Sequence, residues 1–150
     1  MDVNALLDPD IATALEAIGY TSVTSLDEIP AMRARRAVDV DVELSEQVER
    51  IDVTVAGAPG GPEVAVRVHR PKAITGPLPC VYSIHGGGYI AGTYASDDQR
   101  FDTWCPRLGY VGVSVEYRLA PETPYPGPLD DCYAGLAWTV ANAGDLDIDP

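Results

Sequence analysis

The sequence predicts an α/β fold, because the pattern of apolar residues changes along the chain. Residues 48–55 and 64–69 alternate apolar and polar side chains, which is typical of an antiparallel pair of strands. Residues 80–84 and 111–115 are nearly continuous apolar runs, as expected of strands buried on both faces. A stretch of helical periodicity follows each run. The order strand, helix, strand, helix implies parallel pairing with right-handed crossovers.

Two short helices are predicted ahead of the first strand. The first spans residues 8–18, because Asp8 can cap its start and Gly19 suits its exit. The second lies between Ser25 and Ala37, and Pro30 indicates where its regular part begins. The alternating strands that follow, joined by a turn rich in glycine and proline, are expected to form a hairpin with one buried face.

Each continuous strand is followed by a predicted amphipathic helix. The first of these helices places Phe101, Trp104, Cys105 and Leu108 on one face, but Pro106 predicts that it kinks or ends early. The second helix begins near Leu129, and Gly144 stops it. Its apolar face is expected to consist of Leu129, Cys132, Leu136 and Val140.

The composition describes an acidic globular protein. The formal net charge is −13, and such a chain repels phosphate backbones and anionic membranes, so neither nucleic acid nor a membrane is expected as a partner. The segment Met1–Tyr20 lacks the positive start of a secretory signal, and no apolar run reaches the ~18 residues of a membrane span. The three cysteines lack metal-ligand spacing and are interpreted as reduced core thiols, which predicts a cytoplasmic protein.

A glycine-rich loop directly follows the first continuous strand. The residues His85-Gly86-Gly87-Gly88 place three glycines in a row, and a backbone without Cβ atoms can turn successive N–H groups toward one point. Acyl transfer needs such donors, because the carbonyl oxygen becomes an oxyanion in the tetrahedral transition state. An ordinary turn at the end of a strand is the alternative interpretation.

Two further motifs accompany this loop. The sequence EYRLAPE occupies residues 116–122, after the second continuous strand, and LDD at 129–131 opens the last predicted helix. Together with HGGGY at 85–89, they resemble the hormone-sensitive-lipase-like esterases of the α/β-hydrolase superfamily in both order and spacing. The resemblance implies the amino-terminal half of an α/β-hydrolase fold, with a hairpin, parallel strands and flanking helices. It divides the chain into cap or lid helices at 1–47 and a partial hydrolase domain at 48–150.

The same resemblance assigns roles within the glycine-rich loop. Gly86 and Gly87 are expected to be the backbone donors of an oxyanion hole, and Gly88 is expected to permit the close turn of the loop. His85 looks like a catalytic histidine, but the resemblance implies that it braces the loop and is not the base.

The resemblance also bears on the segment that follows the second continuous strand. Arg118 and Glu122 are expected to pair beneath the glycine-rich loop, with a solvated surface ion pair as the alternative. At least one of the bonds Ala120-Pro121 and Tyr125-Pro126 is expected to be cis, although only about 5–6% of X-Pro bonds in folded proteins are.

The sequence contains no candidate nucleophile. In this fold the serine lies within G-x-S-x-G, and no serine here has glycine two residues before and after it. The resemblance places serine, acid and histidine beyond Pro150, as in a truncated or split gene product. We therefore predict a fragment of a serine carboxylesterase for short- to medium-chain esters, inactive alone, using no metal or cofactor and completed by a missing carboxy-terminal half. The alternative is a non-catalytic small-molecule-binding module of the same fold.

Overall fold

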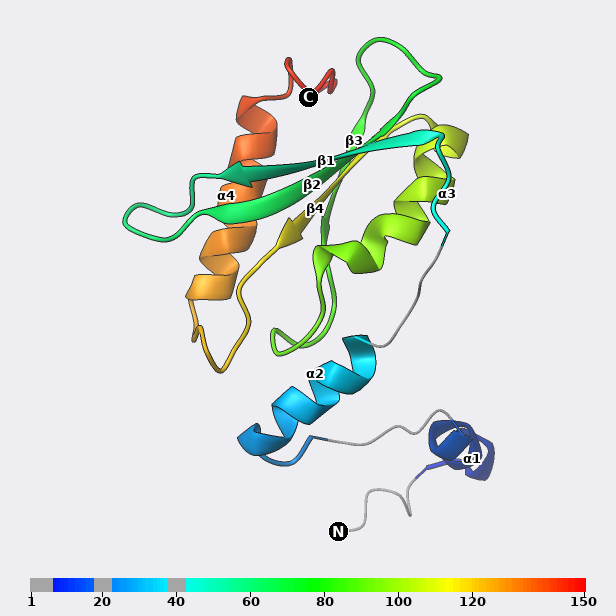
Figure 1. The fold of residues 1–150 in the computed structure, drawn as a ribbon, viewed down its shortest axis with the longest axis vertical. Helices are drawn as coiled ribbons and strands as arrows, with labels where there is room; N and C mark the ends of the chain where they lie inside the picture. The colour runs from blue at the N-terminus through cyan, green and yellow to red at the C-terminus, as the bar shows by residue number, and fades with distance from the viewer. Residues whose placement is uncertain (1–6, 18–22, 38–42) are drawn as a thin grey trace. The chain divides into compact units, whose positions relative to one another are not determined.

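The computed structural model describes residues 7–17, 23–37 and 43–150 (Figure 1). The chain forms two compact units, Met1–Arg35 and Arg36–Pro150. The predicted lid segment, residues 1–47, contains all of the first unit and the first twelve residues of the second.

The amino-terminal helices form close to where the sequence predicts them. The N–H of Asp10 donates a hydrogen bond to the side chain of Asp8 at 2.9 Å, so Asp8 caps the first helix as expected. Gly19, its predicted exit, lies outside the described residues. The bounds are α1 Pro9–Ala17, the 3-10 helix η2 Leu26–Glu28, and α2 Ile29–Ala37.

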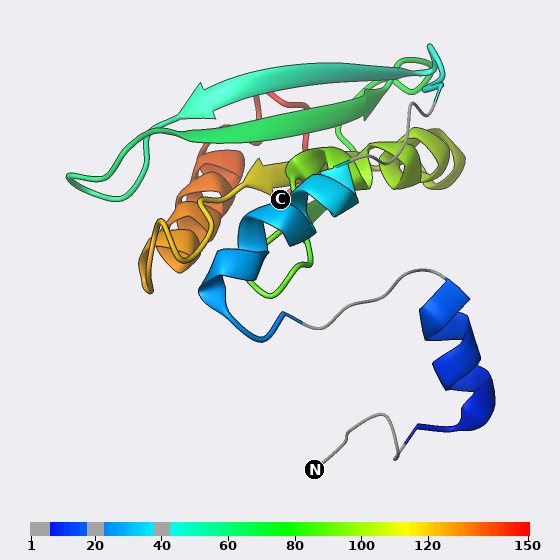
Figure 2. The same ribbon diagram turned by 60° about the horizontal axis from the view of Figure 1, so that its bottom comes forward.

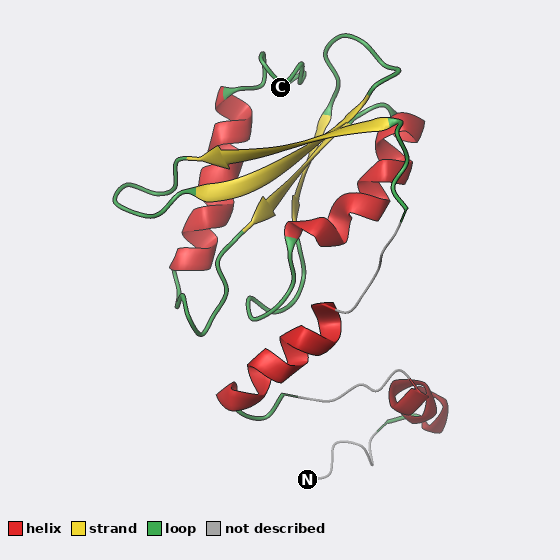
Figure 3. Cartoon of the chain, in the orientation of Figure 1, coloured by secondary structure: helices red, strands yellow, loops and turns green. Residues whose placement is uncertain are grey.

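Four strands form one twisted, mixed sheet in the order β1-β2-β4-β3 (Figure 3). Their bounds are β1 Val48–Val55, β2 Val64–Pro71, β3 Cys80–Ile84 and β4 Val111–Glu116. The strand β2 pairs antiparallel with both β1 and β4. The strand β3 runs parallel to β4, with Cys80 opposite Val111 and Ile84 opposite Val115. The predicted hairpin and the predicted parallel pair are both confirmed.

Two helices cover opposite faces of this sheet, and β4 passes between them in two views (Figures 1 and 2). Alternate residues of β2 establish the two faces. Val66 shares a core with Cys132 of α4, whereas Arg67 and His69 bond to Asp98 of α3. The expectation of a hairpin buried on one face is therefore wrong for β2, because hydrogen-bonded polar side chains fill its second face. The bounds are η3 Tyr94–Asp97, α3 Asp98–Leu108 and α4 Gly127–Ala141.

The helix α4 contacts the sheet through small residues. A Cβ added at Gly135 would lie 2.5 Å from the hydroxyl of Tyr82, so only glycine permits this close approach. The predicted apolar face is therefore wrong except for Cys132, since three of its members are exposed and the buried residues lie beside them. The exposed members are Leu129, Leu136 and Val140, and the buried residues of α4 are Pro128, Asp131, Cys132, Gly135 and Thr139.

The helix α3 continues through Pro106 and ends at Leu108, with Gly109 at φ 71° as its C-cap. The expectation of an early end is wrong, because Pro106 lies in the last turn and removes only one hydrogen bond, that to the carbonyl of Asp102. In the described parts of the chain, no helix has both the length and the apolar character needed to cross a membrane.

Just before β3, a parallel bridge joins Leu78 to Ile148 on the side that faces away from β4. The N–H of Leu78 donates to the carbonyl of Asp147, and the N–H of Asp149 donates to the carbonyl of Leu78, both at 2.9 Å. The carbonyl of the next residue, Pro79, instead accepts from Val111 of β4. Backbone groups alternate between the two sides of a strand. The N–H groups of Cys80, Tyr82 and Ile84 therefore face away from β4, on what we call the open side of β3.

Candidate functional site

The glycine-rich loop leaves the carboxyl end of β3, at the edge of the sheet where the parallel strand β4 also ends (Figure 1). It runs from His85 to Thr93, where the threonine side chain caps η3 by accepting from the N–H of Ala95. The segment that follows β4 lies beside it, because the N–H of Ala120 donates to the carbonyl of Tyr89 at 2.8 Å. Two of the predicted motifs thus meet at one end of the sheet.

Left-handed backbone conformations dominate the loop. Gly87 has φ 129° and Gly88 has φ 63°, and Tyr89 adopts φ 61° although it is not glycine. A Cβ at Gly87 would lie 1.9 Å from the carbonyl oxygen of Ala91, whereas one at Gly88 would meet nothing within 4 Å. Glycine is therefore required at position 87 by both conformation and space, and at position 88 by conformation alone.

The N–H groups of Gly86 and Gly87 have no acceptor among the described residues. Among the described residues, none of the hydrogen bonds outside helices and strands is donated by the N–H of Gly86 or Gly87. Gly86 is exposed and Gly87 is partly exposed. Two neighbouring N–H groups without an internal acceptor can bind a negatively charged oxygen.

His85 is buried within the base of the loop. Its ring stacks on Tyr117 with centroids 4.1 Å apart, and its Nδ1 lies 2.9 Å from the carbonyl oxygen of Gly86. The hydroxyl of Tyr117 donates to the carbonyl of His85 at 2.7 Å. These contacts point inward, toward the loop and β4.

Arg118 forms a bidentate ion pair with a carboxylate of α4. Its Nε and Nη2 each donate to the carboxylate of Asp131 at 2.7 Å, and its backbone N–H donates to the same carboxylate at 3.0 Å. Asp131 is a buried residue of α4 that the sequence did not predict as a partner of Arg118, and the expected pair with Glu122 stays a prediction. The hydrogen bonds with Asp131 raise the pKa of Arg118. The bidentate pair attaches the segment after β4 to the helix that follows it.

Glu116, the last residue of β4, has a role that the sequence pattern did not predict. Its carboxylate accepts from the hydroxyl of Thr93 at 2.8 Å and from the N–H of Tyr94 at 2.6 Å. It therefore holds the far end of the glycine-rich loop. The signal in the sequence was its place immediately before Tyr117 and Arg118 in the EYRLAPE motif.

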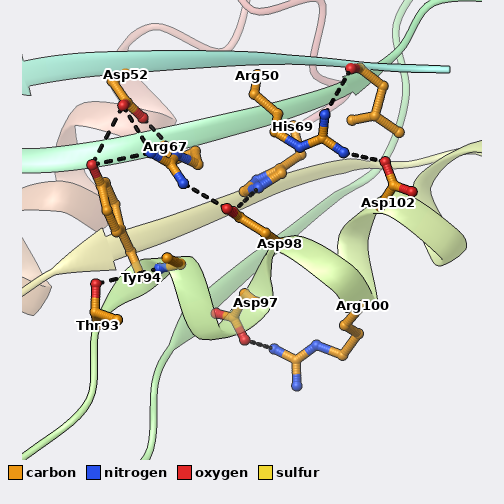
Figure 4. Close-up of polar contacts among 12 residues, drawn as sticks. Arg50, Asp52, Arg67, His69, Thr93, Tyr94, Asp97, Asp98, Arg100 and Asp102 are labelled. Carbon is orange, nitrogen blue, oxygen red and sulfur yellow. Dashed lines mark hydrogen bonds and ion pairs between the residues drawn. The ribbon is translucent and has the colours of Figure 1, made fainter. Parts of the chain in front are cut away.

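A charged network lies between β2 and the start of α3 (Figure 4). Arg67 donates to Asp52 at 2.6 Å and to Asp98 at 2.6 Å, and its guanidinium lies over the ring of Tyr94. The pKa of Arg67 is raised, and that of Asp52 is lowered, chiefly by the hydrogen bonds between them. His69, fully buried, bonds to Asp98 at 2.8 Å. This network attaches α3 to the sheet, beside the end of the loop.

No nucleophile and base come together in the described parts of the chain. His69 faces Asp98, and no recorded hydrogen bond joins a serine or cysteine to either histidine. Ser83 accepts from Arg100, and Ser114 is fully buried in β4. Within the same described ranges, no group of three or more histidine, cysteine, aspartate or glutamate side chains is placed to hold a metal ion.

Comparisons with known proteins agree with this architecture. The alpha/beta hydrolase fold family matches residues 81–150. The carboxylesterase NlhH of Mycobacterium tuberculosis (strain CDC 1551 / Oshkosh) is 35% identical over 145 residues, which are 96% of this chain and 45% of that protein. The hormone-sensitive lipase of Ictidomys tridecemlineatus is 30% identical over 111 residues, 74% of this chain and 14% of that protein.

Solved structures give the same result. A bacterial heroin esterase superposes with a TM-score of 0.81 at 37% identity, covering 99% of this chain and 47% of that one. A vibralactone cyclase superposes with a TM-score of 0.78 at 29% identity, covering 95% of this chain and 45% of that one. The chain thus spans about half the length of NlhH, of the heroin esterase and of the vibralactone cyclase.

The strand order, the parallel pair and the glycine-rich loop after β3 define an α/β-hydrolase fold, of which this chain has the amino-terminal half. Within that superfamily, the chain belongs to the hormone-sensitive-lipase-like carboxylesterase branch.

Proposed function

We propose that this chain supplies the oxyanion hole of a serine carboxylesterase for short- to medium-chain esters. The observation that carries the proposal is the glycine-rich loop, in which the N–H groups of Gly86 and Gly87 lack an internal acceptor while the carbonyls around them are bonded. In this proposal Gly88 permits the turn and His85 braces the loop without acting as a base.

The chemistry assigned to the loop is stabilisation of charge. As an ester carbonyl becomes tetrahedral, its oxygen gains negative charge, and donors already aimed at that position need no reorganisation. One such donor is typically worth about 2.7–4 kcal/mol, or roughly 10²–10³ in kcat. In the proposal, Arg118 and Glu122 support the segment after β4 that touches this loop.

The nucleophile, acid and base of the reaction are proposed to come from a carboxy-terminal half that completes the fold. The open side of β3 supports this, because Val81 and Ile84 are 43% and 50% exposed. The exposed stripe on α4, formed by Leu129, Tyr133, Leu136 and Val140, offers further apolar area to a partner.

Two other assignments stay proposals. Residues 1–47 are proposed to form a lid, on the basis of the family resemblance. A cytoplasmic location is proposed because Cys80, Cys105 and Cys132 are free thiols.

The test is to complete the fold. Residues 1–150 would be fused to the part of carboxylesterase NlhH that follows the matched region, and p-nitrophenyl acetate hydrolysis would be measured. We expect a folded, active fusion in which the clash of Gly87→Ala with Ala91 displaces one N–H donor and lowers kcat by roughly 10²–10³. Gly60→Ala is the matched control, because Gly60 also has positive φ, at 79°, in the distant β1–β2 turn. A folded fusion that keeps full activity with Gly87→Ala would contradict the proposal.

A further inference from the structure

The carbonyl groups of three consecutive loop residues are each held by a defined contact. The hydroxyl of Tyr117 donates to the carbonyl of His85 at 2.7 Å. The Nδ1 of His85 lies 2.9 Å from the carbonyl oxygen of Gly86. The carbonyl of Gly87 accepts from the N–H groups of residues 90 and 91, both at 3.2 Å.

Holding a carbonyl also fixes the N–H of the next residue. The cis peptide bonds of the described chain are Ala120-Pro121 and Tyr125-Pro126, so the peptide bonds of this loop are trans. In a planar trans peptide group, the C=O and N–H bonds point in opposite directions. The contact on the carbonyl of His85 therefore aims the N–H of Gly86, and the contact on the carbonyl of Gly86 aims the N–H of Gly87.

We propose that Tyr117 is a positioning residue whose hydroxyl sets the peptide plane between His85 and Gly86, and that His85, protonated at Nδ1, sets the next plane. The inference rests on the proposed function of the two glycine N–H groups as oxyanion donors. It adds the residue that directly follows β4 to the groups that position the loop, and it makes the loop geometry depend on one phenolic hydroxyl.

Tyr117 is suited to this role by its surroundings. It is 3% exposed, and its ring stacks on the imidazole of His85 at an interplanar angle of 11°. Burial raises the pKa of Tyr117 to about 12, so the hydroxyl keeps the proton that it donates. A buried tyrosine hydroxyl needs a partner, and here the partner is the carbonyl of His85.

The protonation of His85 follows from its two ring nitrogens. Nδ1 faces a carbonyl oxygen, which only accepts, so the proton of this hydrogen bond must be on Nδ1. Nε2 is buried and has no partner among the described residues, so a proton there would be an unsatisfied donor. A Cβ at Gly92 would lie 2.3 Å from Nδ1, so glycine at this position makes room for the imidazole ring.

The test measures the direction of the N–H bonds in the full 150-residue chain. Residual dipolar couplings of the weakly aligned, ¹⁵N-labelled protein report the orientation of each N–H bond relative to the sheet. The variant Tyr117→Phe removes the hydroxyl and keeps the stacked ring. Its matched control is Tyr82→Phe, which removes another hydroxyl that donates to a backbone carbonyl, that of Cys132 at 2.9 Å.

We expect Tyr117→Phe to change the coupling of the Gly86 N–H while the couplings of β4 stay at their wild-type values, and Tyr82→Phe to leave Gly86 unchanged. An unchanged Gly86 coupling in Tyr117→Phe would overturn the role of the hydroxyl. If that variant does not fold, ¹⁵N spectra of the unsubstituted protein decide, because an unprotonated Nδ1 in His85 would overturn the proposed set of contacts. No substrate is involved, so an inactive completed enzyme would contradict the proposed function and leave this result standing.

Discussion

Replacing Gly87 by alanine perturbs the glycine-rich loop more severely than the same change at either neighbour. The new Cβ would lie 1.9 Å from the carbonyl oxygen of Ala91, and residues with a side chain rarely adopt a backbone φ of 129°. The strained conformation costs about 1–3 kcal/mol. Relieving the contact would also break the hydrogen bonds to the Gly87 carbonyl, each worth about 1 kcal/mol. We therefore expect a loss of about 3 kcal/mol in the free energy of unfolding.

The neighbouring glycines are the matched controls. A Cβ at Gly88 meets nothing within 4 Å, so Gly88→Ala should cost only the left-handed conformation, about 1–2 kcal/mol. Gly86 has neither a positive φ nor a neighbour within 4 Å, so Gly86→Ala should stay within about 0.5 kcal/mol of wild type. Urea unfolding followed by tryptophan fluorescence gives the three values. The reasoning is refuted if Gly87→Ala is no more destabilising than Gly86→Ala.

Four further outcomes are expected. The 150-residue chain alone should show no triad-dependent hydrolysis of p-nitrophenyl acetate, and turnover abolished by a serine-directed inhibitor would contradict this. The pKa of Asp52 lies below its usual 3.8, because Arg67 stabilises the carboxylate, so the pair stabilises the fold above that pH. The deficit of Asp52→Asn in urea midpoint should therefore shrink as the pH falls below about 4. Burial raises the pKa of Cys105 to about 11, so iodoacetamide at about pH 8 should label it only after unfolding. In a monomer the amide of Tyr82, on the open side of β3, should exchange its hydrogen faster than the amide of Ser83, which faces β4. Adding the missing half should slow the exchange of the Tyr82 amide and raise the stability of the chain. Strong protection of Tyr82 in a monodisperse monomer would instead indicate a self-sufficient domain.

The elements and the loop could be predicted because they depend on local pattern. Continuous apolar runs located β3 and β4 to within a residue, and the order strand, helix, strand, helix predicted their parallel pairing. The expectation of a cis bond is also confirmed, since both Ala120-Pro121 and Tyr125-Pro126 are cis. Each of these features depends on a few consecutive residues.

What could not be predicted depends on distances between elements. The bidentate pair of Arg118 with Asp131 was not predicted, because Asp131 approaches from α4, thirteen residues along the chain. The buried face of α4 follows from how closely Gly135 approaches the sheet, and periodicity alone does not contain that distance. The same holds for the hydroxyl of Tyr117, which joins the ends of two strands.

The strand order β1-β2-β4-β3 has a consequence for folding during translation. The residues of β3 are synthesised before those of β4, yet β4 is the strand that joins β3 to the hairpin. During translation, the hairpin can therefore form at once, while β3 must wait until residue 116 has left the exit tunnel. The glycine-rich loop is made in that interval, so its geometry can be set only after the chain has passed it by some thirty residues.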